Sequence, residues 1–200
     1  MFRIDRKMTI MRDKELSKEE SLKLITDMIG QAKRNFAKGG SFYFLLWGWV
    51  VMLANLGHYI LGTIGYDRPY IVWLATIPAG IASMVYGARQ SRKSLVKSHL
   101  DNMYGFLWLG IFICVMIILF FMADVSQNLN AIILTFSGLG TFVSGLMLRF
   151  RPLVMGGVVL WVASVVAFTL PINDQYLVGA IGIFAGYLIP GYLLRKAENA

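Results

Sequence analysis

The chain has 200 residues, of which 57% are hydrophobic and 15% are charged. Soluble domains carry about 25% charged residues, so this composition excludes an ordinary soluble domain. The formal net charge is +8, but the basic residues lie beside long apolar segments, and no nucleic-acid recognition module is present. We therefore expect anionic lipid headgroups, and no nucleic acid, to be the partner of this charge.

Both ends of the chain are predicted to be short polar tails. Residues 1–16 have mixed charge and no periodicity, which is typical of a flexible tail, and Met8 or Met11 is an alternative start to Met1. Residues 195–200 follow the last apolar segment and form the predicted C-terminal tail.

An amphipathic helix is predicted over residues 17–38. Residues 17–20 (SKEE) match the capping box that begins many helices. The apolar side chains that follow recur at helical spacing and occupy about 120° of arc; they are Leu22, Ile25, Met28, Ile29, Ala32 and Phe36. Acidic residues lead and basic residues follow along the helix, which suits the helix dipole.

The apolar stripe of this helix is its predicted contact surface, carried by Leu22, Ile25, Ile29 and Phe36. The stripe covers only about two heptads, which is too short for an independent coiled coil. It therefore rests on another surface, and the sequence leaves three open: the lipid headgroups, the cytoplasmic mouth of the bundle, or a protein partner. Gly39-Gly40 permits a sharp turn into the first apolar segment.

Six apolar segments follow, each long enough to cross a bilayer. A spanning helix needs about 20 mostly apolar residues, and one charge at mid-bilayer costs about 2.5–3.5 kcal/mol. The segments contain no Asp, Glu, Lys or Arg, and they cover residues 42–61, 70–88, 103–123, 130–148, 153–170 and 176–194. The predicted fold class is all-α: a polytopic membrane protein with a six-helix domain over residues 42–194.

The basic residues predict the orientation of the chain. The termini and alternate loops hold 18 of the 19 Lys and Arg residues, and the three loops of the other side hold only Arg68. Basic loops stay in the cytoplasm, so both termini are predicted to be cytoplasmic. Within the loop over residues 89–102, four side chains are candidates for headgroup contact: Arg89, Arg92, Lys93 and Lys97. A solvated loop without such a task is the alternative.

The six segments are predicted to form three antiparallel hairpins, because the connecting loops are short. Small residues recur every four positions in two segments: Ser137, Thr141 and Gly145, then Gly140 and Ser144, and Gly182 with Gly186. Such spacing lets helix backbones approach closely in lipid. The sequence favours contacts within one chain and leaves a homo-oligomer as the alternative.

The residues needed for catalysis are sparse, so we expect no enzyme, no metal and no cofactor. The chain has two histidines, His58 and His99, predicted on opposite sides of the membrane, whereas zinc hydrolases need histidines paired at helical spacing. Asn55 and His58 are three residues apart and share a helix face near the outer boundary. They are a candidate ligand contact, and a purely structural pair is the alternative.

The run ESLKLITDMIGQAK, followed by FYFLLWGWVVMLANLGHYIL, resembles a family of small, uncharacterised six-span proteins of the bacterial inner membrane. The shared pattern is an amphipathic helix with an acidic start that runs into a Trp-Gly-Trp first span. The resemblance covers residues 15–61, and the other spans match in hydropathy alone. It implies the bacterial inner membrane and implies no activity.

These observations lead to a functional hypothesis with one rival. The leading hypothesis is a non-enzymatic membrane protein with a regulatory, sensory or assembly role, exerted through the helix over residues 17–38 on lipid or on a cytoplasmic protein. The rival is a small transporter or channel for a neutral or weakly polar solute. Its path would run between the second and sixth spans, where Pro78 and Pro190 are expected to kink the helices.

Overall fold

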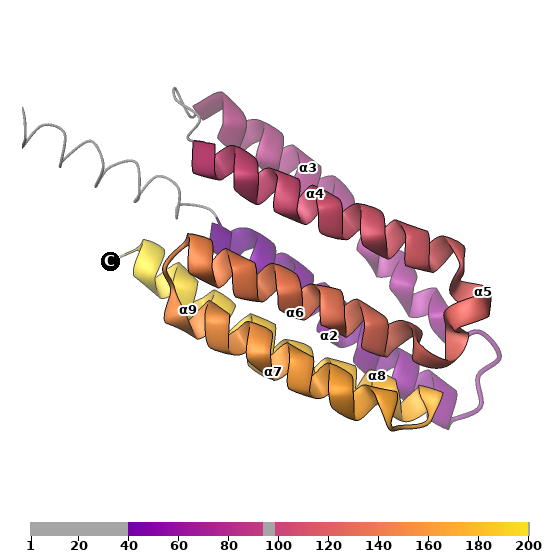
Figure 1. Ribbon diagram of the computed structural model, residues 1–200. Coiled ribbons are helices and arrows are strands. Elements are labelled where there is room, and N and C mark those ends of the chain that lie inside the picture. The colour runs from indigo at the N-terminus through magenta and orange to yellow at the C-terminus, as the bar shows by residue number, and fades with distance from the viewer. Residues whose placement is uncertain (1–39, 94–98, 200) are drawn as a thin grey trace, which may run out of the picture. The chain divides into compact units, whose positions relative to one another are not determined.

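A computed structural model describes residues 40–93 and 99–199, and this part of the chain is helical, with no strand. The predicted tail over residues 1–16, the predicted amphipathic helix over residues 17–38 and Lys97 lie outside the described residues. In chain order the elements are α2 (Gly40–Thr63), the 3-10 helix η1 (Pro69–Ala75), α3 (Thr76–Lys93), α4 (His99–Phe120), α5 (Met122–Val125), the 3-10 helix η2 (Ser126–Asn128), α6 (Leu129–Met147), α7 (Arg151–Phe168), α8 (Ile172–Ile183), the π-helix η3 (Phe184–Leu188) and α9 (Ile189–Glu198) (Figure 1).

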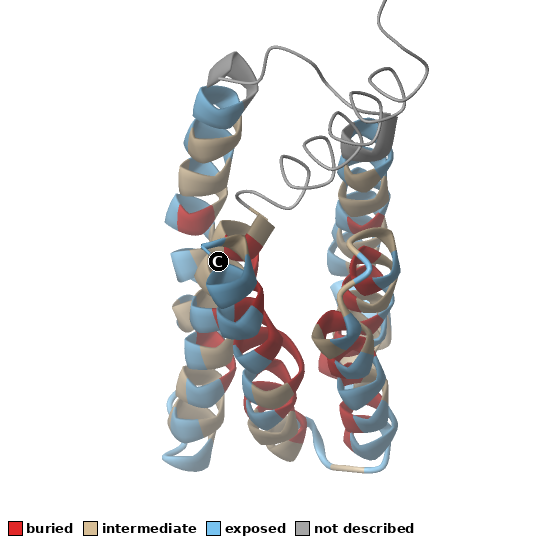
Figure 2. Ribbon diagram, turned by 90° about the vertical axis from the view of Figure 1, so that its left-hand side faces the viewer, coloured by how far each residue is buried: buried red, intermediate tan, exposed pale blue. Residues whose placement is uncertain are grey.

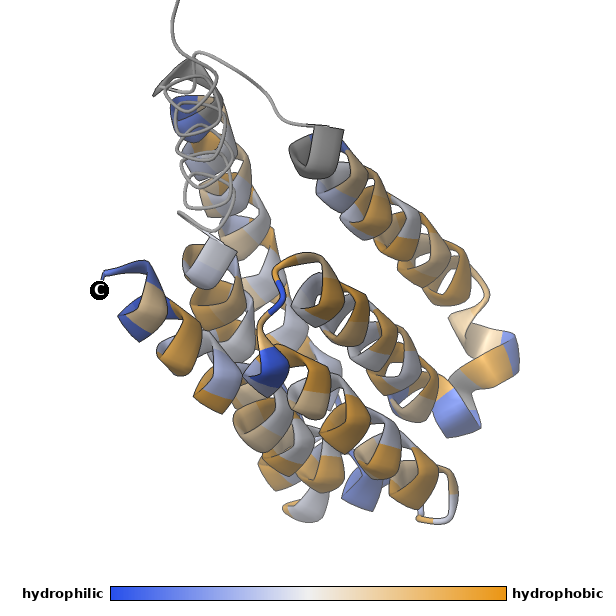
Figure 3. Ribbon diagram, turned by 60° about the vertical axis from the view of Figure 1, so that its left-hand side comes forward, coloured by the Kyte–Doolittle hydropathy of each residue, from blue (hydrophilic) through white to orange (hydrophobic). Residues whose placement is uncertain are grey.

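Six helical segments are long and apolar enough to span a membrane, which confirms the predicted number. They are Gly40–Thr63, Pro69–Gln90, Asn102–Phe120, Leu129–Met147, Arg151–Phe168 and Ile172–Glu198. The shortest has 18 residues, which at 1.5 Å per residue is about 27 Å, close to the hydrocarbon thickness. Figure 3 shows apolar residues along these helices and hydrophilic residues mainly toward their ends.

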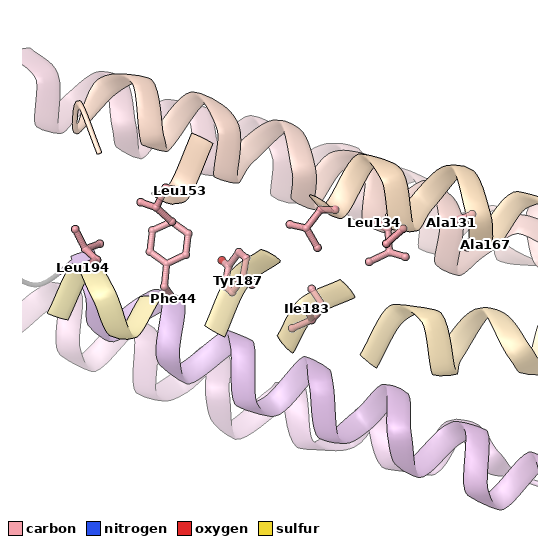
Figure 4. Close-up of a cluster of buried hydrophobic side chains, with 10 residues drawn as sticks. Phe44, Ala131, Leu134, Leu153, Ala167, Ile183, Tyr187 and Leu194 are labelled. Carbon is pink, nitrogen blue, oxygen red and sulfur yellow. The ribbon is translucent and has the colours of Figure 1, made fainter. Parts of the chain in front are cut away.

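The tightly packed core consists of α2, α6, α7 and the last span, α8–η3–α9. Buried residues make up 44%, 39% and 56% of the apolar windows of spans four, five and six, against 6% in spans two and three. Figure 2 shows the buried residues gathered where the core helices face one another. The central cluster joins all four elements through side chains such as Phe44, Leu134, Leu153, Ile183 and Tyr187 (Figure 4).

Glycine contacts explain why these helices approach so closely. A Cβ added at Gly145 would lie 2.5 Å from the backbone nitrogen of Val154, and one at Gly157 would lie 2.8 Å from the carbonyl oxygen of Gly138. A Cβ at Gly182 would lie 2.8 Å from Ala163 Cβ. The small-residue faces predicted from the sequence thus pack against neighbours within the same chain, as small residues do between helices in lipid.

Helices α3 and α4 lie outside this core and contact it along one side each (Figure 3). Helix α3 lies against α2, where the indole nitrogen of Trp47 donates to Ser83 Oγ at 3.0 Å. Helix α4 lies against α6, where Ile111 and Trp108 cover Gly140. The most extensive helix contact joins α6 and α7, which belong to different predicted hairpins, so the three-hairpin arrangement stays a prediction.

The two prolines of spans two and six are accommodated in different ways. Pro78 lies in the first turn of α3, directly after the 3-10 helix η1, where a missing N–H breaks no α-helical hydrogen bond. The predicted mid-helix kink is therefore a change from 3-10 to α geometry. Pro190 follows the π-helical turn of η3, and a wider turn of this kind accommodates a local defect in the hydrogen-bond ladder.

Several observed helices extend beyond the predicted segments. Helix α9 continues to Glu198, so residues 195–198, which were expected in a tail, lengthen the sixth span. Arg195 and Lys196 lie in its last turn, where cations suit the helix dipole. Helix α3 likewise continues to Lys93 and α4 begins at His99, which places most of the predicted loop over residues 89–102 in helices.

Candidate functional site

The first turn of α2 is held by the last turn of α9. The backbone nitrogen of Ser41 donates to Glu198 Oε1 at 2.9 Å, and the Ser41 hydroxyl donates to Glu198 Oε2 at 2.5 Å. A carboxylate at a helix N-terminus accepts orphan N–H groups and suits the helix dipole. The beginning of the first span and the end of the sixth therefore lie at the same end of the bundle, here called the terminal end.

An aromatic cluster joins α2 to α3 at the terminal end. The rings of Phe42 and Tyr86 stack with centroids 3.9 Å apart, and Tyr43 meets Tyr86 edge to face at 5.5 Å. Helix α3 approaches closely because Gly87 faces Tyr43: a Cβ at Gly87 would lie 2.9 Å from the Tyr43 hydroxyl oxygen. Aromatic pairs of this geometry contribute about 0.5–1.5 kcal/mol beyond their burial, so the cluster fixes α3 to α2 at the terminal end.

An open groove runs along α3 from the aromatic cluster. It has a volume of about 470 Å³ and is lined by Phe42, Pro78, Ile81, Ala82, Val85, Tyr86 and Arg89. Among these residues only Arg89 is charged, and its side chain is exposed. Arg89 is one of the four predicted headgroup contacts, and Arg92 and Lys93 follow it in the last turn of α3.

The remaining predicted contact residues cannot be placed in this site. Leu22, Ile25, Ile29, Phe36 and Lys97 lie outside the described residues. The first described residue, Gly40, has a hypothetical Cβ 3.7 Å from Glu198 Oε1. The described part of the chain therefore begins beside the Ser41–Glu198 contact.

Asn55 and His58, the predicted outer pair, both face α8 near the end of the bundle opposite the terminal end. The His58 ring stacks on Tyr176 with centroids 3.6 Å apart, and its Nδ1 accepts a hydrogen bond from the Trp73 indole at 3.1 Å. Asn55 is 1% exposed and donates to the carbonyl oxygen of Val51 at 2.9 Å. A ligand contact by this pair remains a prediction.

Asn55 belongs to a group of buried amides, whose other members, Asn130 and Gln175, were not predicted from the sequence. Asn130 Nδ2 donates to the carbonyl oxygen of Gln175 at 2.6 Å, and Gln175 Nε2 donates to the carbonyl oxygens of Gln127 and Leu170 at 2.7 and 3.1 Å. A Cβ at Gly179 would lie 2.5 Å from Asn55 Oδ1 and 2.7 Å from Asn130 Nδ2. Because Gly179 has no side chain, the amides of Asn55 on α2 and Asn130 on α6 both fit beside it.

One polar atom of this group has no hydrogen-bond partner among the described residues, namely Asn55 Oδ1. The signal for these amides was present in the sequence, because Asn55, Asn130 and Gln175 lie in or directly beside segments that are otherwise apolar. Polar side chains at such positions face the interior of a bundle.

Metal ligands do not cluster in the described ranges 40–93 and 99–199: no three His, Cys, Asp or Glu side chains there are placed to hold a metal ion. Comparison with known proteins supplies no family for the chain. No protein-family model matches it, and neither a curated protein nor a solved structure matches it.

Proposed function

We propose that the protein is a non-enzymatic multi-pass protein of the bacterial inner membrane with a regulatory, sensory or assembly role, exerted by the amphipathic helix over residues 17–38. The observation that carries this proposal is the contact of Glu198 with Ser41 at 2.9 and 2.5 Å. It ties the position where that helix joins the bundle to the end of the sixth span. In this proposal, binding at the helix reaches the core through the beginning of the first span and the end of the sixth.

The orientation of the chain follows from its charges. With 18 of 19 basic residues on the side of the termini, the positive-inside rule places both termini, and thus the terminal end, in the cytoplasm. The apolar stripe of Leu22, Ile25, Ile29 and Phe36 then contacts anionic lipid or a cytoplasmic protein. The end of α3 that carries Arg89 also lies at the terminal end, because Tyr86 of α3 stacks on Phe42 of α2.

The decisive experiment places charge in the apolar stripe. The double variant Ile25→Glu, Ile29→Glu is expected to lose the proteins or lipids that co-purify with the tagged wild-type chain in mild detergent, because a charged stripe no longer binds an apolar surface. The matched control is Thr26→Glu, Gln31→Glu, which adds two charges outside the apolar arc and should retain them. Unchanged co-purification and an unchanged cellular phenotype in the first variant would refute the proposal.

A second variant tests the connection between helix and bundle. Glu198→Gln keeps the shape of the side chain and removes the charge that Ser41 binds. We expect a loss of about 1 kcal/mol in stability, since a hydrogen bond to a charged group at a half-exposed site is of this size, together with weaker partner retention. Lys196→Gln, exposed in the same turn, is the control. If both variants retained the partner equally, partner binding at the helix would not depend on the Ser41–Glu198 contact.

The buried amides favour one second candidate, a small transporter or channel for a neutral or weakly polar solute. Asn55 Oδ1 is buried without a partner among the described residues and lies beside the Gly179 space, as a group that binds a passing polar solute would. Flux of small neutral solutes into proteoliposomes would support this candidate, provided that Asn55→Leu abolishes the flux. Equal flux in empty and protein-containing vesicles would remove it.

A further inference from the structure

The groove on α3 is about as long as one lipid leaflet is thick. Its α3 residues recur at positions 78, 81, 82, 85, 86 and 89, the spacing of a single helix face. From Pro78 to Arg89 this face rises about 16 Å at 1.5 Å per residue, and one leaflet of hydrocarbon is about 15 Å thick. Pro78 lies near the middle of the span Pro69–Gln90 and Arg89 lies at its end, so the groove runs from the bilayer centre to the interface.

The groove is also polarised along its length. Ile81, Ala82 and Val85 give it an apolar floor, and Arg89 gives it a cationic end. Ala82 is the smallest side chain on this face, which deepens the groove at its centre, while the stacked Phe42 and Tyr86 form a wall at the cationic end. This arrangement matches an amphiphile that has one apolar chain and one anionic group.

We propose that this groove binds an anionic phospholipid, with an acyl chain along Ile81, Ala82 and Val85 and the headgroup phosphate on Arg89. A guanidinium binds phosphate oxygens through two parallel hydrogen bonds. A free phosphate ion would contact Arg89 alone, whereas the acyl chain of a bound lipid would also cover the apolar floor. The helix continues beyond Arg89 to Lys93.

The assignment of this lipid to the cytoplasmic leaflet rests on the orientation in the proposed function. Lipid binding to the groove does not depend on that orientation. A measurement on purified protein in detergent has no inside or outside, so it tests the groove alone. The Ile25→Glu, Ile29→Glu experiment tests the helix alone, and each proposal can fail while the other stands.

The test is native mass spectrometry of the full chain in detergent with equimolar phosphatidylglycerol and phosphatidylcholine. The wild-type chain is expected to retain one phosphatidylglycerol in preference to phosphatidylcholine. Arg89→Gln should reduce that preference about fivefold, since one Arg near an anionic headgroup contributes about 1 kcal/mol. Arg195→Gln, which removes an exposed cation of α9 at the same end but away from the groove, should leave the preference unchanged.

A groove-filling pair separates the acyl chain from the headgroup. Ala82→Leu fills the floor and should lower retention of both lipids, whereas Ala88→Leu adds the same volume at an exposed position outside the groove and should retain them. Photo-crosslinking with a phosphatidylglycerol that carries a diazirine on its acyl chain should mark α3 between Pro78 and Val85.

Three outcomes would each overturn the proposal. The first is equal retention of the two lipids by the wild-type chain. The second is a preference that is the same in Arg89→Gln as in the wild type. The third is crosslinking spread evenly over α3 and α4, which would mean that lipid covers both helices without a defined position.

Discussion

Helix α6 and the apolar part of α4 make an instructive pair, because both have 19 residues and they lie against each other. The window of α4 has a mean hydropathy of 2.5 and is 6% buried, whereas the window of α6 has a mean hydropathy of 1.6 and is 44% buried. The more apolar helix is thus the one outside the core. In lipid, apolar surface is already solvated, so helices associate through close packing and internal hydrogen bonds.

The residues of the two helices show this difference directly. Along α6, Gly138, Gly145 and Ser144 face its neighbours and are buried. Along α4, Cβ atoms added at Gly105 and Gly110 would have no atom of the described chain within 4 Å. A glycine in a spanning helix is therefore a packing residue only where another backbone lies beside it.

The largest expected effect comes from filling a glycine in the core. Gly156→Leu would place a side chain against the carbonyl of Gly186, with Pro190 Cγ 2.9 Å from the added Cβ. Because backbone atoms cannot move aside easily, we expect a loss of more than about 2 kcal/mol in stability, measured by unfolding in mixed detergent and SDS micelles. Gly110→Leu, on the lipid-facing side of α4, is the control and should change stability by less than about 0.5 kcal/mol. Equal losses would contradict the division between core and outer helices.

A smaller effect is expected from the buried amides. Gln175 is 2% exposed, and Gln175→Leu removes two hydrogen bonds, to the carbonyl oxygens of Gln127 and Leu170. We expect a loss of about 1–2 kcal/mol in the same assay, because two carbonyl oxygens lose this donor. Asn102→Leu, at an exposed position of α4, should be neutral. If Gln175→Leu were also neutral, packing alone would hold the core.

The smallest effect concerns the turn between α6 and α7. Arg149 has φ of 52°, in the left-handed region that favours glycine, and the turn is closed by a hydrogen bond from Phe150 N to Gly145 O at 2.8 Å. Arg149→Gly should stabilise the protein by up to about 1 kcal/mol by relieving this conformation. Arg151→Gly, in the first turn of α7, should destabilise it slightly. A loss of stability with Arg149→Gly would show that the arginine side chain itself matters more than its backbone geometry.

The sequence predicted the features of the chain that depend on local composition. Six spans follow from the absence of charge over about 20 residues, and the close contacts at Gly145 and Gly182 follow from small residues repeated at helical spacing. Which spans would form the core did not follow, because mean hydropathy ranks α4 first and the relevant quantity is the fit between facing backbones. Hydropathy alone carries no information on such pairings.

The candidate site was predictable only in part, because it depends on contacts between segments that are remote in the sequence. The charge pattern singled out Arg89, but the groove beside it depends on α3 meeting Phe42 of α2, two segments that are remote in the sequence. The contact of Ser41 with Glu198 joins residues 157 positions apart, and no local pattern indicates it. Asn55 and His58 contact Gly179 and Tyr176 of α8, and no local pattern indicates these neighbours.

The bond between Ser41 and Glu198 sets an order for biosynthesis. Synthesis runs from the N-terminus, so the first span is made before the sixth, and in the finished protein it packs against α8 and α9. Until then the amide and hydroxyl of Ser41 have no carboxylate to bind. Closure of the bundle is therefore a late step, in which the end of the sixth span docks onto the start of the first.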